Sequence, residues 1–356
     1  PLVIMPKEVR DVEGGKLDKN QIIGTGPYKL VDYVADQYVK LERFEDYTAD
    51  EDHPASGLGG KNVAYLDKIT FNIVPEKQSR LNGLLAGEYD YAEALDPSVY
   101  GQIASNSSLQ PVVMSPYFKV WAVMNTTKAP LDNPKLREAI LIGLDQESVM
   151  LAASGHNALY KLNHSIFYEN QIWYSEAGKD KYNQKNIERA KQLIQEAGYN
   201  GEEIIINTNK DYDFMYQAAI ATHAQLMELG LNVKLQVVDW PTVVSWRNPE
   251  GWKNYHINYD GVSIRFDPTG YNVNFEGAST VQPYASEEMD RLLADGMKYS
   301  DPNDRKPYYD RMQELIYEDI PIIQHGDVYQ LDAASVKLKN NLPWYVLRFW
   351  NVWLEQ

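Results

Sequence analysis

Residues 231–268 read LNVKLQVVDWPTVVSWRNPEGWKNYHINYDGVSIRFDP, and their pattern predicts two strands joined by a short helix. Val233, Leu235 and Val237 alternate with polar residues, as in a half-buried strand. Asp239 is a typical helix N-cap and Pro241 suits the first turn, so we expect a helix over 240–247. A turn rich in Gly, Pro and Asn follows, and a second strand is predicted over 255–264.

Three side chains of this stretch are candidates for ligand binding. Trp240 and Arg247 lie two helical turns apart and therefore share a face, and Arg265 ends the second strand. Aromatic faces supply contact area, and Arg supplies forked donors for a carboxylate or hydroxyls, so the three could line a cleft for an organic ligand. The alternative is a structural unit with surface arginines and core tryptophans, which these residues alone do not exclude.

The composition narrows the class of protein. At 356 residues the chain can form two domains with substantial cores. The net charge of −16 argues against nucleic acid or an anionic membrane surface as a partner. The absence of cysteine excludes disulfides and thiol catalysis, and no apolar run approaches the roughly 18 residues of a membrane span. The 26 tyrosines and 8 tryptophans suit cleft walls that bind sugars or peptides, but Tyr-rich surfaces are also common in secreted proteins.

The order of predicted elements indicates an α/β fold. Strands are expected at 27–34, 38–44, 67–74 and 88–94, with helices at 76–86 and 97–105. A shift in composition after 121 suggests a first domain of 1–121 plus 327–356 and a second of 122–326. The second is expected to contain helices near 134–143, 145–153, 186–197, 211–229, 286–298 and 302–318. Extended segments are predicted at 109–114 and 118–124, and the apolar tail, 343–356, is predicted to form a strand. Connecting strands near 120–125 and 321–327 would form a two-stranded hinge.

Several patterns that suggest catalysis or cofactors are discounted. Gly24-Thr25-Gly26 lacks the Lys-Ser/Thr ending of a phosphate loop, and Asp50-Glu51-Asp52 lacks the spacing of a calcium loop. The six histidines show no metal-ligand spacing, and no nucleophile elbow is present. We therefore predict no catalytic residues, no metal and no cofactor.

Motifs spread along most of the chain resemble the extracytoplasmic solute-binding proteins of ABC importers, in the family 5 group that includes dipeptide-, oligopeptide- and nickel-binding proteins. The matches are individually weak, but their order is specific. They are Gly24-Thr25-Gly26-Pro27-Tyr28, Tyr65-Leu66-Asp67, Arg80-Leu81, Gly87-Glu88-Tyr89-Asp90, Asn125, Pro130-Leu131-Asp132-Asn133-Pro134, Arg137-Glu138-Ala139-Ile140, Ala190-Lys191, Glu196-Ala197-Gly198-Tyr199, Gly230-Leu231-Asn232-Val233, Asp239-Trp240, Asp267-Pro268, Pro321 and Phe349-Trp350-Asn351-Val352-Trp353.

The resemblance implies a type II clamp of two lobes with mixed sheets and no enzymatic activity. It implies a substrate-binding component that delivers a peptide-like or other small polar solute, such as an oligosaccharide, to the membrane permease of an ABC importer. An extracytoplasmic location in a bacterium is expected, either periplasmic or as a cell-surface lipoprotein. The family is normally longer at its N-terminus, so the chain resembles the C-terminal portion, with one lobe incomplete.

The resemblance also implies roles for individual residues. Trp240 matches a tryptophan that stacks on ligand, and Arg247 an arginine that reaches a ligand carboxylate. Glu93 matches a loop that touches ligand from the other lobe, Phe214 matches a helix position facing the cleft, and Trp121 lies in the strand that leaves the first lobe. The alternatives are that Trp121 is a core residue at the hinge, that Phe214 is a core residue rather than a ligand contact, and that Glu93 is a rim charge.

One departure concerns the residue that meets the ligand's amino group. Peptide binders of the family carry an aspartate on the strand end after a Gly-Trp pair. Here Gly261-Val262 stands in place of that pair, and Arg265 stands in place of the acid. The exchange favours an anionic or hydroxyl-rich ligand group at this point.

Two other classes of function remain open. A glycosidase would use paired carboxylates in an aromatic cleft, but 50 acidic residues make chance pairs such as Glu202-Glu203 unavoidable. A protein-interaction domain would bind no small ligand. Tight binding of a small molecule would argue against a protein-interaction domain, and turnover of a glycoside would establish a glycosidase.

Overall fold

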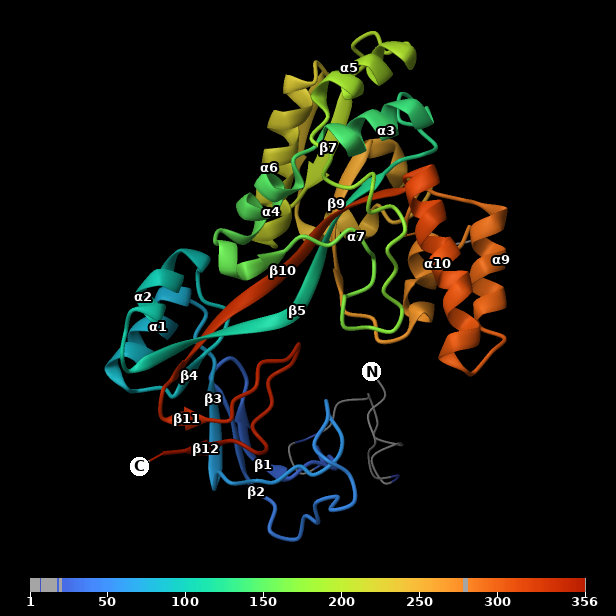
Figure 1. The fold of residues 1–356 in the computed structure, drawn as a ribbon. Helices are drawn as coiled ribbons and strands as arrows, with labels where there is room; N and C mark the ends of the chain where they lie inside the picture. Colours follow the sequence, from blue (N-terminus) through green and yellow to red (C-terminus); the bar gives the residue numbers. More distant parts are fainter. Residues whose placement is uncertain (1–6, 8–17, 19–20, 278–280, 356) are drawn as a thin grey trace. The chain divides into compact units, whose positions relative to one another are not determined.

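The computed structural model describes residues 7, 18, 21–277 and 281–355 and divides into two compact units. The first unit comprises Pro1–Ser115 with Gln330–Gln356, and the second comprises Pro116–Tyr329. Two long strands, β5 (Leu109–Met124) and β10 (Ile322–Ser335), contain the points of division (Figure 1). The predicted boundaries were 121/122 and 326/327, and their role as the limits of two moving lobes stays a prediction.

The first unit contains an antiparallel sheet in the order β1-β2-β3. The predicted hairpin is confirmed, with a turn that holds Asp36 at φ 59°, a conformation that a short polar side chain tolerates. The third strand pairs with the second, from Tyr38 opposite Asn72 to Glu42 opposite Lys68. The strands are β1 (Tyr28–Val34), β2 (Tyr38–Arg43) and β3 (Lys68–Asn72).

The rest of the first unit is built on short elements around a small core. Helix α1 (Lys77–Ala86) ends before Gly87, as predicted. The φ of Gly87 is 74°, in the left-handed region that glycine adopts most readily. The core joins Val112 and Met114 of β5 to Ala334 of β10 and Val352 of the tail. The other elements are β4 (Tyr91–Ala92), η3 (Pro97–Val99), α2 (Tyr100–Ala104), β11 (Leu338–Lys339) and β12 (Trp353–Leu354).

The second unit is a mixed sheet with a core on each face. Its strands follow the order β10-β5-β9-β7-β8, with β9 antiparallel to β5 and parallel to β7. Side chains of β5 alternate, so Val120 and Met124 enter one core while Trp121 and Val123 enter the other. Besides β5 and β10, the strands of this unit are β6 (Tyr160–Lys161), β7 (Ile204–Thr208), β8 (Val233–Val237) and β9 (Ile257–Ser263).

Helices cover this sheet largely where the sequence predicted them. One core packs the sheet against helices α3 to α6, and the other packs it against α9 and α10, which lie side by side in Figure 1. The helices of the unit are α3 (Pro134–Gly143), α4 (Gln146–Ser154), η4 (Asn157–Leu159), α5 (Ile187–Glu196), α6 (Asp213–Glu228), α7 (Trp240–Ser245), η5 (Gly251–Asn254), η6 (Pro268–Tyr271), α8 (Asn272–Phe275), α9 (Glu287–Gly296) and α10 (Pro302–Asp319).

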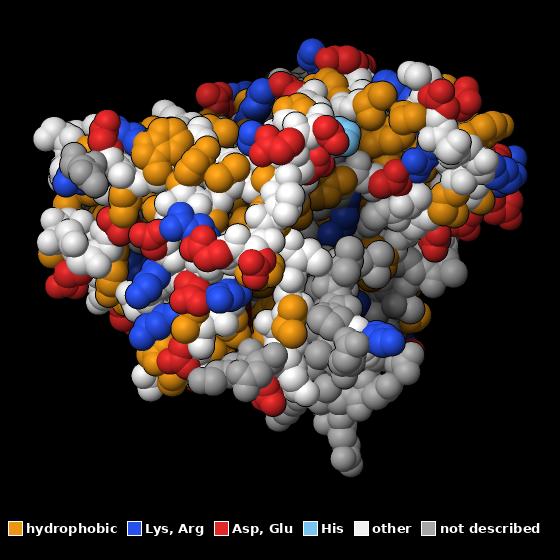
Figure 2. Space-filling model, turned by 90° about the horizontal axis from the view of Figure 1, so that it is seen from below, with side chains coloured by type: hydrophobic (Ala, Val, Ile, Leu, Met, Phe, Trp, Pro, Cys, Tyr) orange, Lys and Arg blue, Asp and Glu red, His pale blue; other side chains and the backbone are white. Residues whose placement is uncertain are grey.

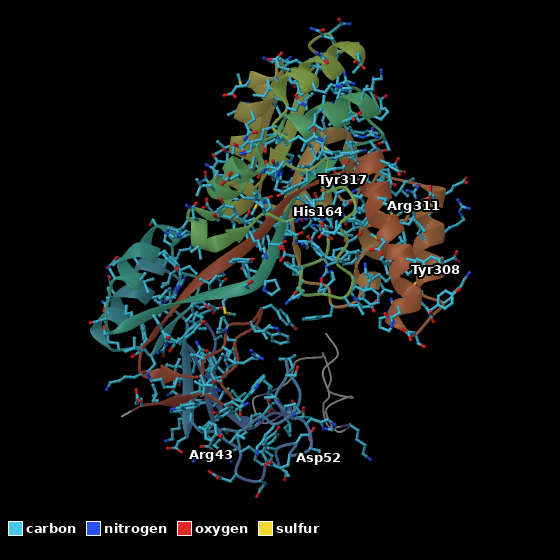
Figure 3. All side chains as sticks on the ribbon, in the orientation of Figure 1. Arg43, Asp52, His164, Tyr308, Arg311 and Tyr317 are labelled. Carbon is cyan, nitrogen blue, oxygen red and sulfur yellow. The ribbon has the colours of Figure 1, made fainter. Side chains whose placement is uncertain are left out.

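A buried ion pair and its neighbours inside the second unit satisfy one another. Lys119, fully buried, places its Nζ 2.7 Å from Oδ1 of Asp327, whose Oδ2 accepts from Asn163 at 2.9 Å. The hydroxyl of Tyr317 donates to the backbone oxygen of His164 at 2.8 Å, and Figure 3 shows these two residues close together. Such pairing compensates the cost of removing charges and dipoles from water.

His325 belongs to a second buried network. Its Nε2 lies 3.0 Å from the hydroxyl of Tyr259, and the two rings stack with centres 5.6 Å apart. Its Nδ1 lies 2.5 Å from Oε1 of Gln146, which can only accept, so the proton is on Nδ1. Burial lowers the pKa of His325 to about 3, so the ring is neutral at pH 7.

Two predictions of local structure are wrong. The segments 109–114 and 118–124 form one continuous strand, β5. The apolar tail is irregular except at β12, because its backbone bonds to a loop instead of a neighbouring strand. Asn351 N donates to Val63 O at 2.7 Å, and Val63 N donates to Oδ1 of Asn351 at 2.8 Å.

One face of the molecule carries charges of both signs. Figure 2 shows acidic and basic side chains interspersed with apolar ones on one face. Among the residues described, no helix combines the length and apolar character needed to cross a membrane.

Candidate functional site

Most of the predicted ligand residues of the second unit lie near the point where α7 meets β9, and Trp121 is the exception. Helix α7 begins at Trp240, because Asp239 caps it by accepting from Thr242 N at 2.9 Å. Asp211 accepts from the backbone N–H of Trp240 at 2.7 Å, which fixes the entry to the helix. The sequence predicted this N-cap and this start, and both are confirmed.

Arg247 follows the end of α7 and lies on the same side as Trp240. The centre of its guanidinium is 5.2 Å from the centre of the Trp240 ring, within the range of a cation–π contact. Its Nη2 donates to Oδ2 of Asp260 at 3.0 Å. The side chain is 30% exposed while that of Asp260 is 6% exposed, so one end of the ion pair meets solvent. The shared face predicted from the spacing is therefore present.

Asp260 is the part of this site that the sequence analysis missed. It lies in β9, and burial raises the pKa of its carboxyl while the charges of Arg247 and Arg265 lower it. Its Oδ1 accepts from the N–H of Gly261 at 2.8 Å. An aspartate inside an otherwise buried strand requires a cation nearby, and that requirement is the signal that could have identified it.

Arg265 lies just beyond β9 and retains donors that the protein does not use. Its Nη1 donates to the hydroxyl of Ser263 at 3.1 Å, and its buried Nε has no hydrogen-bond partner. Its stem lies against Gly270, where an added Cβ would be 2.7 Å from Cδ of Arg265. Across the described ranges, no carboxylate lies within ion-pair distance of Arg265. The arginine can therefore accept a new anionic partner without breaking an existing ion pair.

Aromatic rings extend the site toward α6. Phe214 stacks on Phe118 with centres 5.5 Å apart, and Tyr212 meets Trp240 edge-on at 5.0 Å. The contact with β9 is close, because a Cβ at Gly261 would lie 2.6 Å from Cζ of Phe214. Phe214 is partly buried against the core, and its role as a ligand contact stays a prediction.

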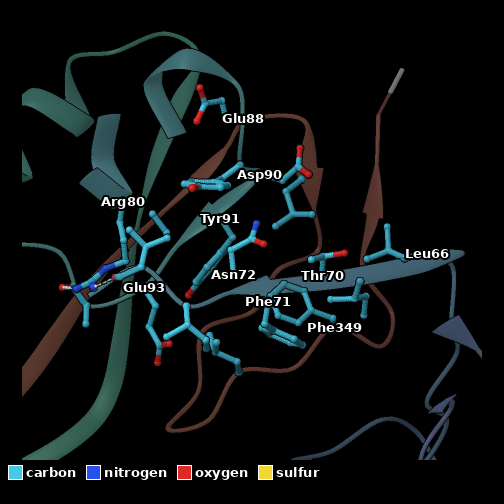
Figure 4. Close-up of a pocket in the computed structure, with 18 of the residues that line it drawn as sticks. Leu66, Thr70, Phe71, Asn72, Arg80, Glu88, Asp90, Tyr91, Glu93 and Phe349 are labelled. Carbon is cyan, nitrogen blue, oxygen red and sulfur yellow. Dashed lines mark hydrogen bonds between the residues drawn. The ribbon is translucent and has the colours of Figure 1, made fainter. Parts of the chain in front are cut away.

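Trp121 and Glu93 lie elsewhere. Trp121 has no exposed surface, and its indole N–H donates to Gln324, so it occupies a core position. Glu93 belongs to the first unit, where it lines a cavity of about 650 Å³ (Figure 4). Within the described part of the chain, no group of three or more His, Cys, Asp or Glu residues could hold a metal ion.

The comparisons with known proteins identify relatives over nearly the whole chain. A sequence model described as "Bacterial extracellular solute-binding proteins, family 5 Middle" matches residues 2–281. The oligopeptide-binding protein AppA of Bacillus subtilis is 26% identical over 89% of this chain and 60% of its own length. A probable peptide ABC transporter periplasmic-binding protein of Sinorhizobium fredii is 27% identical over 98% of this chain and 68% of its own length.

The fold is shared with a solved solute-binding protein. The ABC transporter substrate-binding protein CtaP of Listeria monocytogenes has a TM-score of 0.86 and 24% identity, covering 99% of this chain and 72% of that one. The likeness confirms the predicted α/β fold of the periplasmic-binding-protein type. The chain spans about 60% of the length of the first relative named above. These relatives are binding proteins, and they give no support to the glycosidase alternative.

Proposed function

Because the chain belongs to the bacterial extracellular solute-binding proteins of family 5, we propose that it is the substrate-binding part of an ABC importer and binds a peptide-like solute. Two relatives support the peptide class, since their names describe an oligopeptide-binding protein and a peptide transporter component. Delivery to a membrane permease and an extracytoplasmic location follow from the same proposal. Anchoring by lipid stays a prediction from the resemblance.

The observation that supports a specific contact is the unpaired guanidinium of Arg265. Arg247 is already neutralised by Asp260, so it offers mainly its cation–π contact with Trp240 and any donors that remain free. Arg265 has no such counterion, and a charge-assisted hydrogen bond to it would contribute roughly 1.5–3 kcal/mol. We therefore assign Arg265 to an anionic group of the ligand, such as a peptide carboxylate, and Trp240 to an apolar or aromatic side chain.

Titration calorimetry with di- to pentapeptides tests this proposal. Each peptide is offered with a free C-terminal carboxylate and as the C-terminal amide. We expect the free acids to bind, R265Q to weaken them about 10- to 150-fold, and the amides to be insensitive to R265Q. The matched control is R291Q, since Arg291 is exposed on α9.

Two outcomes would contradict the assignment. If peptides bind with equal affinity to the protein and to R265Q, Arg265 is not the anion site. If no peptide binds and an oligosaccharide does, the peptide class is wrong. A bound ligand at a hundred times its Kd should stabilise the protein by about 2.7 kcal/mol, so thermal unfolding gives an independent check.

A further inference from the structure

The backbone that carries Arg265 is held by side chains from a loop 94 positions earlier. Nε2 of Gln171 donates to the backbone oxygen of Arg265 at 2.5 Å. Nε1 of Trp173 donates to the backbone oxygen of the next residue, Phe266, at 3.3 Å. β9 ends at Ser263, so its ladder does not reach these two carbonyl groups. The loop therefore supplies the hydrogen bonds that a neighbouring strand supplies inside the sheet.

Asp267 continues this anchoring. Its Oδ2 accepts from Nη1 of Arg305 at 2.7 Å and its Oδ1 accepts from Nη2 at 2.9 Å, so the ion pair has two parallel hydrogen bonds. Oδ1 also accepts from the backbone N–H of Thr269 at 3.0 Å, which fixes the start of η6 and with it Gly270. The stem of Arg265 lies against this glycine. Both the backbone and the stem of Arg265 are therefore held in place.

The loop that carries Gln171 is itself fixed on both sides of this residue. Nζ of the buried Lys119 donates to the backbone oxygen of Ser165 at 3.1 Å. Further along, the loop runs beside α10 (Figure 1), where Nζ of Lys306 donates to the backbone oxygen of Tyr174 at 3.0 Å. The contact with Arg265 thus starts from a loop that is already tied to the core and to a helix.

The orientation of the Gln171 side chain is also fixed. Its Oε1 accepts from the backbone N–H of Tyr168 at 2.9 Å, and its own backbone N–H donates to the backbone oxygen of Tyr168 at 2.9 Å. Because the amide oxygen is held in this way, the amide nitrogen points at the oxygen of Arg265. One side chain therefore joins the loop to the segment that follows β9.

Ordering matters for Arg265 because its side chain is long. A free arginine samples many rotamers, and an anion that binds to it restricts it to a few of them. Where the protein has already restricted the side chain, binding loses less entropy and the ligand is held more tightly. The contacts to the backbone and stem of Arg265 provide such a restriction before any ligand arrives.

We propose that Gln171 is a positioning residue for Arg265: it holds the backbone of the arginine, so that an ordered guanidinium meets the anionic group of the ligand. Gln171 acts through Arg265 and does not need to touch the ligand. This role rests on the assignment of Arg265 in the proposed function, and it adds a residue that neither the spacing nor the resemblance singled out. Trp173 and Arg305 contribute to the same anchoring.

Calorimetry with the pairs of free-acid and amidated peptides separates positioning from a general effect on the fold. Q171M retains the length of the side chain and removes both of its hydrogen bonds. We expect Q171M to weaken the free acids about five- to tenfold and the amides less than twofold. Added to R265Q, it should weaken the acids no further, because the group that it positions is gone. The matched control is Q195M, since Gln195 is exposed on α5.

Nuclear magnetic relaxation of the Arg265 Nε–H group, measured without ligand, tests the ordering directly. The signal is identified by its absence from R265Q. We expect the order parameter of this bond to be lower in Q171M than in the unaltered protein and unchanged in Q195M. W173F, which removes the neighbouring hydrogen bond to Phe266, should lower it as well. Because no ligand is present, this measurement decides the positioning role even if no peptide binds, a result that would count against the proposed function alone.

Three results would overturn the positioning role of Gln171. The first is an order parameter of Arg265 that is the same in Q171M and in the unaltered protein. The second is equal weakening of acids and amides by Q171M, which would indicate a general change in the fold. The third is a further loss of acid binding when Q171M is added to R265Q, since that loss could not pass through Arg265.

Discussion

Replacing His325 with glutamine should remove part of the acid sensitivity of the protein. The ring is fully buried, and its pKa is lowered to about 3 by desolvation. In the unfolded chain the pKa of the same ring is about 6.5. Because the folded state holds the neutral form, this contribution to stability is complete above the unfolded pKa and is lost as the pH falls toward the folded pKa.

The magnitude follows from the unfolded pKa. The pKa of the ring in the unfolded chain, about 6.5, is about 1.5 units above pH 5, and each unit corresponds to about 1.36 kcal/mol. Lowering the pH from 7.5 to 5 should therefore reduce the free energy of unfolding by about 2 kcal/mol. The result depends little on the folded pKa as long as that pKa lies well below 5. Glutamine retains a donor and an acceptor for Gln146 and Tyr259 but does not titrate in this range.

Urea unfolding at the two pH values measures the effect. We expect the free energy of unfolding of the unaltered protein to fall between pH 7.5 and pH 5 by about 2 kcal/mol more than that of H325Q. Other titrating groups are common to both proteins and cancel in this comparison. H53Q is the matched control, since the His53 side chain is 75% exposed and lies in the first unit. An equal pH dependence in H325Q and the unaltered protein would refute the reasoning.

Two further predictions concern packing and buried charge in the second unit. G261A should destabilise it by about 1–3 kcal/mol, because the new Cβ would lie 2.6 Å from Phe214, while G24A, with no heavy atom within 4 Å, should change stability by less than about 0.5 kcal/mol. K119M should cost about 3–5 kcal/mol because it leaves the Asp327 carboxylate buried without its cation. The double variant K119M/D327L should recover part of that loss, and urea unfolding checks all four proteins. A loss from G261A no larger than that from G24A, or no recovery in the double variant, would contradict these accounts.

Local signals predicted the elements of the second unit well. The helix expected over 134–143 coincides with α3, because Asn133 caps it and Pro134 begins it. The cap at Asp239 likewise fixed the position of α7. These features depend on residues that are close in sequence, so they can be recognised from the sequence alone.

The features that the sequence did not predict depend on contacts between residues far apart in the chain. The apolar tail looked like a strand, but Asn351 bonds to a loop nearly 300 positions earlier, and periodicity contains no such information. The ion pair of Arg247 with Asp260 joins a helix end to a strand, and spacing alone did not select that acid among 50. The burial of Trp121 could not be predicted either. Alternation along β5 distinguishes the two faces of the sheet, but a core covers each face.

The discontinuity of the first unit bears on how the protein is synthesised. Its two parts are separated by residues 116–329, so at about 5–20 residues per second the ribosome makes the second part about 10–40 s after the first. The hairpin of β1 and β2 can form early, but β4 cannot pair with β10 until the end of β10 emerges. The continuous second unit can fold in that interval. While residues 116–329 are being synthesised, the two parts of the first unit therefore cannot pair, and its exposed apolar surface is open to chaperones during that interval.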